Sequence, residues 1–174
     1  IAQALVVEMG AEPVVIAEAD RPLYHAALAH GSNHVMTLLG ESMQVLGQIG
    51  VTHPERVLGP LARATVDNAL ASGEDALTGP VARGDVATVA AHVAALRELS
   101  QDGVSAADAA RSPERVTAPD ASVRGARQAD AGEQLLAGYR ALARQTAARA
   151  ASSGRIDETT YRAVLAALDG EERP

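Results

Sequence analysis

Two short polar segments carry the residues of this chain that are able to do chemistry. The first runs from Tyr24–Ala27 to Ser32 and Asn33, and the second is Leu77–Asp85. The helices around them are apolar and need no such groups, so polar residues buried or lining a cleft there must bond to each other or to a ligand. These segments are therefore the first hypothesis for a functional site.

His25 is the best candidate for acid–base chemistry, because an imidazole takes up or releases a proton near neutral pH. Ser32 and Asn33 offer a hydroxyl and an amide that can orient a carbonyl or hydroxyl oxygen. The same residues also fit a purely structural role, as hydrogen-bonded groups at a helix junction. The sequence leaves both interpretations open.

The second segment combines a turn with a cation. Gly79 and Gly84 are typical of a turn, and Asp85 is typical of a residue that caps the following helix. A turn requires neither Thr78 nor Arg83. Because a hydroxyl and a guanidinium suit a carboxylate or phosphate, Thr78 and Arg83 are predicted to bind the anionic group of a small substrate.

His30 and His34 stand one helical turn apart, which is the spacing of a two-histidine metal site. Without a further ligand motif the pattern indicates a solvated helix face, and no metal site is predicted. A histidine-based metal binder remains a third class of function. No Gly-x-Gly-x-x-Gly loop and no Walker loop occur, so the chain lacks the usual cradle for a dinucleotide pyrophosphate.

Composition limits the fold class and the partners. The 174 residues fit one domain, or one domain plus a fragment, and 47% of them are hydrophobic, which is enough for a core. The net charge of -7 argues against nucleic acid and anionic membranes as partners. All 15 basic residues are Arg and Cys is absent, which excludes lysine Schiff-base and thiolate chemistry. No membrane span and no signal segment are visible, so a cytoplasmic location is expected.

Apolar spacing and breaker residues predict a mainly helical chain. A helix over 1–9 closes at Gly10, and Pro13–Ala17 reads as a buried strand. One helix and one strand cannot form a sheet, so residues 1–19 are predicted to be the tail of a truncated Rossmann-like α/β domain. Residues 20–174 are predicted to form the helical domain.

Five helices are predicted in that domain. The first is a long helix from Arg21 to about Ile49 that turns His25 and Ser32 toward a core. Residues 101–128 lack an apolar period and are predicted to be a loop or mobile insertion. The other four helices are expected over 52–73, from Asp85, over 129–152 and from Asp157.

The polar motifs together resemble the C-terminal domain of uncharacterised bacterial proteins that join a Rossmann-like domain to a helical domain of unknown function. That domain is similar to the helical dimerisation domain of 6-phosphogluconate dehydrogenase and its relatives, including ketopantoate and pyrroline-carboxylate reductases. The resemblance covers residues 1–100 well and residues 129–168 loosely. The residues that carry it are Tyr24–Ala27, Ser32, Asn33, Thr65, Asn68, Leu77–Pro80, Arg83–Asp85 and His92.

The resemblance implies a helical bundle of the 6-phosphogluconate dehydrogenase C-terminal type. It also implies an NAD(P)-dependent oxidoreductase, incomplete without a cofactor domain before Ile1, that forms a homodimer and acts on a small anionic keto or hydroxy compound. The better-known dehydrogenases place a Lys one turn before an Asn on the first long helix, whereas here Ala29 stands four residues before Asn33.

That departure makes His25 the candidate proton donor, and His25, Asn33 and Arg83 are expected to surround one pocket. The alternative is a non-catalytic helical dimerisation or scaffold module, in which the same polar residues lock helix junctions.

Overall fold

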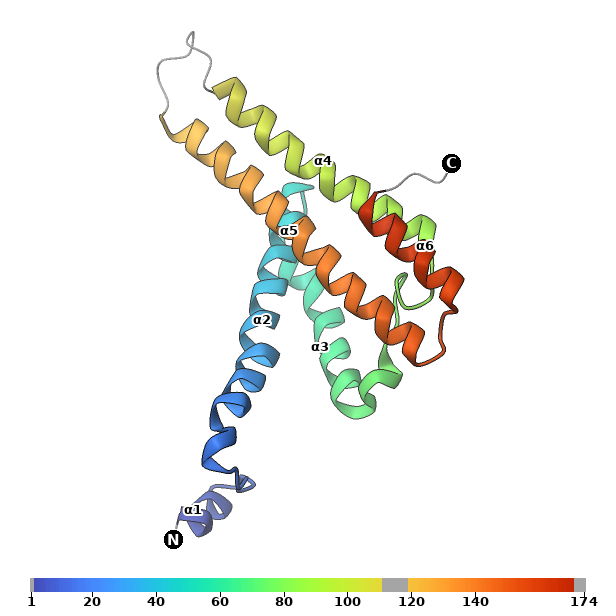
Figure 1. The fold of residues 1–174 in the computed structure, drawn as a ribbon. Coiled ribbons are helices and arrows are strands. Elements are labelled where there is room, and N and C mark those ends of the chain that lie inside the picture. Colours follow the sequence, from blue (N-terminus) through green and yellow to red (C-terminus); the bar gives the residue numbers. More distant parts are fainter. Residues whose placement is uncertain (1, 111–118, 171–174) are drawn as a thin grey trace. The chain divides into compact units, whose positions relative to one another are not determined.

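The computed structural model describes residues 2–110 and 119–170, and this part of the chain is mainly helical, as predicted (Figure 1). It divides into two compact units, Ile1–Arg63 and Ala64–Pro174, each of which is described by itself. No strand occurs among the described residues. The elements are α1 (Ala2–Glu8), η1 (Glu18–Asp20), α2 (Arg21–Gln48), α3 (Pro54–Ser72), η2 (Gly73–Ala76), α4 (Val86–Ala110), α5 (Pro119–Ser152) and α6 (Glu158–Asp169), where η marks a short 3-10 helix.

The first unit opens with α1, and Gly10 lies in the turn that closes this helix, as predicted, with a φ of 76° that glycine adopts without strain. The strand predicted over Pro13–Ala17 is not found, because this segment has no regular structure. A strand requires a neighbour whose N–H and C=O groups pair with its own, and no described segment forms such a ladder with it. The proposed tail of an α/β domain at residues 1–19 stays a prediction.

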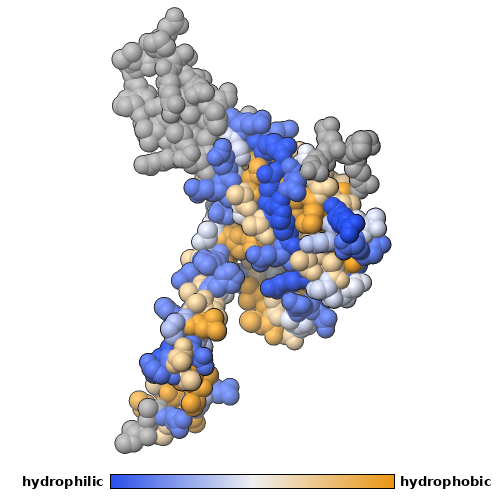
Figure 2. All heavy atoms as spheres, viewed as in Figure 1, coloured by the Kyte–Doolittle hydropathy of each residue, from blue (hydrophilic) through white to orange (hydrophobic). Residues whose placement is uncertain are grey.

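The long helix α2 begins and ends where the sequence predicts. Pro22 lies in its first turn, where the missing N–H costs nothing, and Gly50 ends it with a φ of 91°. No residue of α2 is buried, and Leu23 and Met36 are 73% and 74% exposed. His25 and Ser32 are exposed too, so they face no core within the first unit. Figure 2 shows hydrophobic spheres among hydrophilic ones along this segment.

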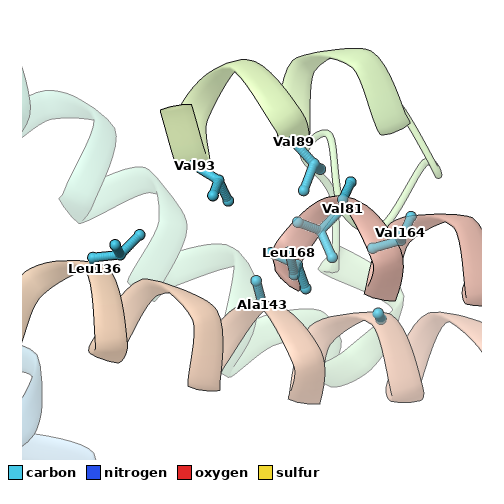
Figure 3. Packing of buried hydrophobic residues seen from close by; sticks show 9 residues of the cluster. Val81, Val89, Val93, Leu136, Ala143, Val164 and Leu168 are labelled. Carbon is cyan, nitrogen blue, oxygen red and sulfur yellow. The ribbon is translucent and has the colours of Figure 1, made fainter. Parts of the chain in front are cut away.

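The second unit holds the core of the described chain. Helix α4 packs along α5, and α6 packs against both. Figure 3 shows the side chains of these helices converging on one cluster, together with Val81 from the preceding turn. The largest fully buried side chains are Leu168, Val89, Val93 and Val164. Apolar residues recur on one face of each helix, and burying these faces against each other is why the three helices associate.

A second, smaller cluster holds the turn before α4 in place. Ala82 is buried with Ala150 and Ile156, and Leu77 and Tyr161 pack against them. The turn therefore carries two kinds of residue. Its apolar members, Val81 and Ala82, anchor it, while Thr78 and Arg83 remain exposed.

Helix α6 starts and stops at signals that the sequence displays. The Asp157 carboxylate accepts a hydrogen bond of 2.8 Å from the Thr160 N–H, as expected of an N-cap. Gly170 ends the helix with a φ of 78°.

The loop predicted over 101–128 is largely wrong. Helix α4 continues to Ala110 and α5 already begins at Pro119, while residues 111–118 lie outside the described residues. The segment lacks an apolar period, but it is rich in Ala, which has the highest helix propensity of all residues. Backbone preference extends these two helices beyond the part that their apolar faces indicate.

Candidate functional site

The three predicted catalytic residues lie on α2 with their side chains exposed. The Ser32 hydroxyl donates a 2.7 Å hydrogen bond to the Leu28 carbonyl one turn back and lies 3.5 Å from Asn33 Oδ1. The His25 ring makes no hydrogen bond within the described part of the chain. Among the described residues, none of these three side chains forms a hydrogen bond to another helix.

The turn that precedes α4 is built from two glycines with positive φ. Gly79 has a φ of 104° and Gly84 a φ of 69°. A β-carbon at Gly84 would collide with the Thr160 methyl group on α6, so the turn lies directly against that helix. This close approach fixes where the chain enters α4.

Asp85 caps α4, as the sequence predicts. Its carboxylate accepts a 2.7 Å bond from the Thr88 hydroxyl and a 3.1 Å bond from the Thr88 N–H. These two bonds, the hydroxyl first, hold the pKa of Asp85 below its ordinary value of 3.8, and the charges of Arg83 and His92 add to the effect. Asp85 is therefore occupied as a cap and acts as an anion.

An open groove of about 520 Å³ lies within the second unit, where the end of α3 and η2 meet Arg149 of α5. Three residues that the sequence singles out, Thr65, Asn68 and Thr78, share this groove. The remaining lining residues are Ala69, Gly73, Glu74, Ala76, Leu77 and Arg149.

Arg149 supplies the positive charge of this groove. Its guanidinium lies 3.4 Å from the Glu74 carboxylate, and both side chains are more than 60% exposed. An exposed pair at this distance is weak, so a ligand carboxylate can compete with Glu74 for the guanidinium. Two hydroxyls, an amide and a guanidinium on one concave surface suit a small polar anion. These four groups can bind and orient such an anion, and the Glu74 carboxylate adds a basic group to the lining.

Arg155 holds one wall of the groove. Its Nη1 donates a 2.9 Å hydrogen bond to the Leu77 carbonyl, and its Nη2 donates a 2.9 Å bond to the Glu74 carbonyl. Arg155 follows α5, so these bonds fasten the η2 turn to the α5–α6 connection. The positions of Glu74 and Thr78 therefore depend on a residue about 80 positions further along the chain.

His92 has a structural partner. Its Nδ1 lies 3.0 Å from the Tyr139 hydroxyl, which joins α4 to α5, and the two rings meet edge to face. Burial raises the pKa of Tyr139 above its ordinary value of 10.0, so the phenol keeps its proton at neutral pH. The pair links two helices.

The structure brings together some of the predicted site residues and not others. Thr78 lines the groove, whereas Arg83 does not. His25, Ser32 and Asn33 belong to the other compact unit, so the expected pocket shared by His25, Asn33 and Arg83 stays a prediction. Glu74 and Arg149 were missed, because no local motif in the sequence marks either of them.

Residues 1–110 match the family described as a domain of unknown function, DUF2520. The chain belongs to this family. The DUF2520 match includes every site residue predicted from the sequence and ends before Arg149. No curated protein and no solved structure matches the chain.

Two further features are absent from the described part of this DUF2520 chain. It holds no group of three or more His, Cys, Asp or Glu residues placed to bind a metal ion. It also has no helix with the length and apolar character needed to cross a bilayer.

Proposed function

We propose that this chain is the helical substrate-binding and dimerisation domain of an NAD(P)-dependent oxidoreductase that acts on a small anionic keto or hydroxy compound. Two things support the proposal. They are the resemblance of the polar motifs to the 6-phosphogluconate dehydrogenase C-terminal domain and the groove that gathers Thr65, Asn68 and Thr78. NAD(P) would supply or accept a hydride.

The cofactor itself does not fit the residues of this chain. The sequence has no glycine-rich loop that could cradle a pyrophosphate. Cofactor binding is therefore assigned to another part of the protein.

The groove is the observation that carries the proposed substrate class. Thr78 and Arg149 are assigned to the anionic group of the substrate, because a hydroxyl and a weakly paired guanidinium lie together there. Thr65 and Asn68, on the α3 side, are assigned to the polar remainder of the molecule. The sequence by itself assigns the anionic group to Arg83 instead, and the two arginines can be tested separately.

On α2, His25 is assigned to proton exchange with the reacting oxygen, and Ser32 and Asn33 to its orientation. Their exposure supports this assignment, since residues that lock a helix junction would be buried with partners. The exposed α2 also supports the homodimer, because a second copy would cover the apolar residues that this chain leaves bare.

The test uses the intact gene product that contains this chain, with NADH or NADPH and a panel of small keto and hydroxy acids. We expect turnover of a carboxylated substrate. Arg149→Gln should raise KM about tenfold with little change in kcat, since it removes binding common to ground and transition states. His25→Gln should lower kcat about 100-fold, as expected for loss of a general acid or base.

Arg83→Gln is the matched control for Arg149→Gln. If Arg83→Gln raises KM and Arg149→Gln does not, the assignment of the anion to the groove is wrong. Absence of turnover with every cofactor and substrate, together with no ligand-induced rise in Tm, would contradict the enzyme and favour the scaffold module.

A further inference from the structure

The exposed face of α2 presents two imidazoles whose nitrogens converge. His30 Nδ1 and His34 Nδ1 lie 2.7 Å apart, and the rings meet edge to face with an interplanar angle of 83°. Both histidines are exposed. When both rings are neutral, only one of the two nitrogens can carry the proton between them, so the other offers a lone pair.

This separation is close to that of two ligands on one metal ion. Two nitrogens, each about 2.0–2.1 Å from a shared ion, lie about 2.9 Å apart for a right angle at the metal and about 3.4 Å apart for a tetrahedral angle. A small rotation of either exposed ring opens the observed distance to these values. The helix already holds the two α-carbons one turn apart, so binding requires no ordering of the backbone.

We propose that His30 and His34 form a two-histidine site for one divalent transition-metal ion, with water completing the coordination. Imidazole ligands favour Cu²⁺, Ni²⁺ and Zn²⁺ over Mg²⁺ and Ca²⁺, which prefer oxygen. Because the described part of the chain adds no third protein ligand, the ion keeps several exchangeable positions. The sequence alone favours a solvated face here, and the convergence of the two nitrogens is what changes that interpretation. The site is independent of the proposed oxidoreductase function.

The experiment is calorimetric titration of NiCl₂ into the chain without a histidine tag, in a buffer that does not bind metals. We expect one Ni²⁺ per chain, and no heat of binding with MgCl₂. His30→Ala and His34→Ala should each weaken Ni²⁺ binding at least about tenfold, because a single imidazole loses the benefit of the second ligand held nearby. Ala is the strongest helix former, so circular dichroism should show α2 intact in both variants.

His53→Ala is the matched control. His53 is an exposed histidine of the same unit, with Glu55 as its neighbour, and its loss should leave Ni²⁺ affinity unchanged. In wild type, Ni²⁺ should broaden the imidazole NMR signals of His30 and His34 before those of His53. Unchanged affinity in His34→Ala, equal loss in His53→Ala, or one ion per two chains would each overturn the proposal.

Discussion

At the scale of single residues, Asp85 couples the start of α4 to pH. Its pKa lies below the unfolded value of 3.8, chiefly through the two bonds from Thr88. A carboxyl with a lowered pKa stabilises the fold fully above its unfolded pKa, and this stabilisation is lost as pH falls through the folded pKa. Acid should therefore weaken the cap only below about pH 4.

We predict that Asp85→Asn lowers Tm near neutral pH, because the amide keeps an acceptor but not the charge. The difference in Tm between the variant and wild type should become smaller in acid, where wild-type Asp85 loses its charge as well. The measurement is Tm of both proteins from about pH 7 to about pH 3. Asp157→Asn, at the equivalent cap of α6, is the control for a general cap effect. A gap between wild type and Asp85→Asn that is constant with pH would show that the charge contributes nothing.

Two properties of Gly84 can be tested separately, its positive φ and the lack of space beside it for a side chain. Gly84→Ala should lower the free energy of unfolding by about 1 kcal/mol for the left-handed backbone, and by about 1–3 kcal/mol more for the collision with Thr160. Gly154→Ala is the matched control, since Gly154 has a φ of 71° and open space around it. Equal losses in urea denaturation would contradict the close approach to α6.

Arg140 of α5 contains two buried nitrogens, Nε and Nη2, that have no hydrogen-bond partner among the residues that the structure describes. An unsatisfied buried donor costs free energy, while the aliphatic stem of Arg contributes packing. Arg140→Met should therefore keep or raise the free energy of unfolding, by up to about 1 kcal/mol. A clear loss of stability in urea denaturation would show that the guanidinium contributes to the fold.

At the scale of elements, the η2 turn depends on a distant cation. Arg155 bonds two carbonyls of that turn, and its side chain is 30% exposed. Arg155→Met should cost about 1–2 kcal/mol of unfolding free energy and speed amide exchange over Gly73–Leu77. Arg162→Met removes an exposed pair within α6 and should cost less than about 0.5 kcal/mol. Equal costs, or unchanged exchange, would contradict this role of Arg155.

The elements themselves were predictable to different degrees. The ends of α2 and α6 follow from local signals, Pro22, Gly50, Asp157 and Gly170, which act within one turn of the chain. The strand predicted over Pro13–Ala17 is not found, because a strand depends on partners elsewhere in the chain. The prediction of a loop over 101–128 was largely wrong for a local reason, because helix propensity does not require an apolar stripe.

At the scale of the whole molecule, α2 is a helix whose apolar residues a single copy of the chain leaves exposed. It spans 28 residues without a single buried one, and Leu28 is 53% exposed. A long helix whose apolar residues are exposed gains little from packing within its own chain. The proposed homodimer would supply the missing contacts.

We predict that Leu28→Glu raises the dissociation constant of that dimer at least about tenfold, because it places a charge in an apolar contact. Thr37 lies on the opposite side of α2 from Leu28, so Thr37→Glu should leave the dissociation constant unchanged. Sedimentation at several protein concentrations measures both. A chain that stays monomeric at every concentration would refute the dimer, and equal effects of the two variants would place its interface elsewhere.

The sequence by itself determined the helical class, the limits of α2, the start of α6 and the Asp85 cap. Each of these depends on neighbours within a few positions, so its physical cause is visible in the chain. Only the tertiary structure decided that Thr78 shares a groove with Thr65, Asn68 and Arg149, and that Arg83 does not. The contacts of Arg149 and Arg155 with the η2 turn bring Arg149 beside residues that lie far earlier in the chain, and no periodicity in the sequence records which side chains then become neighbours.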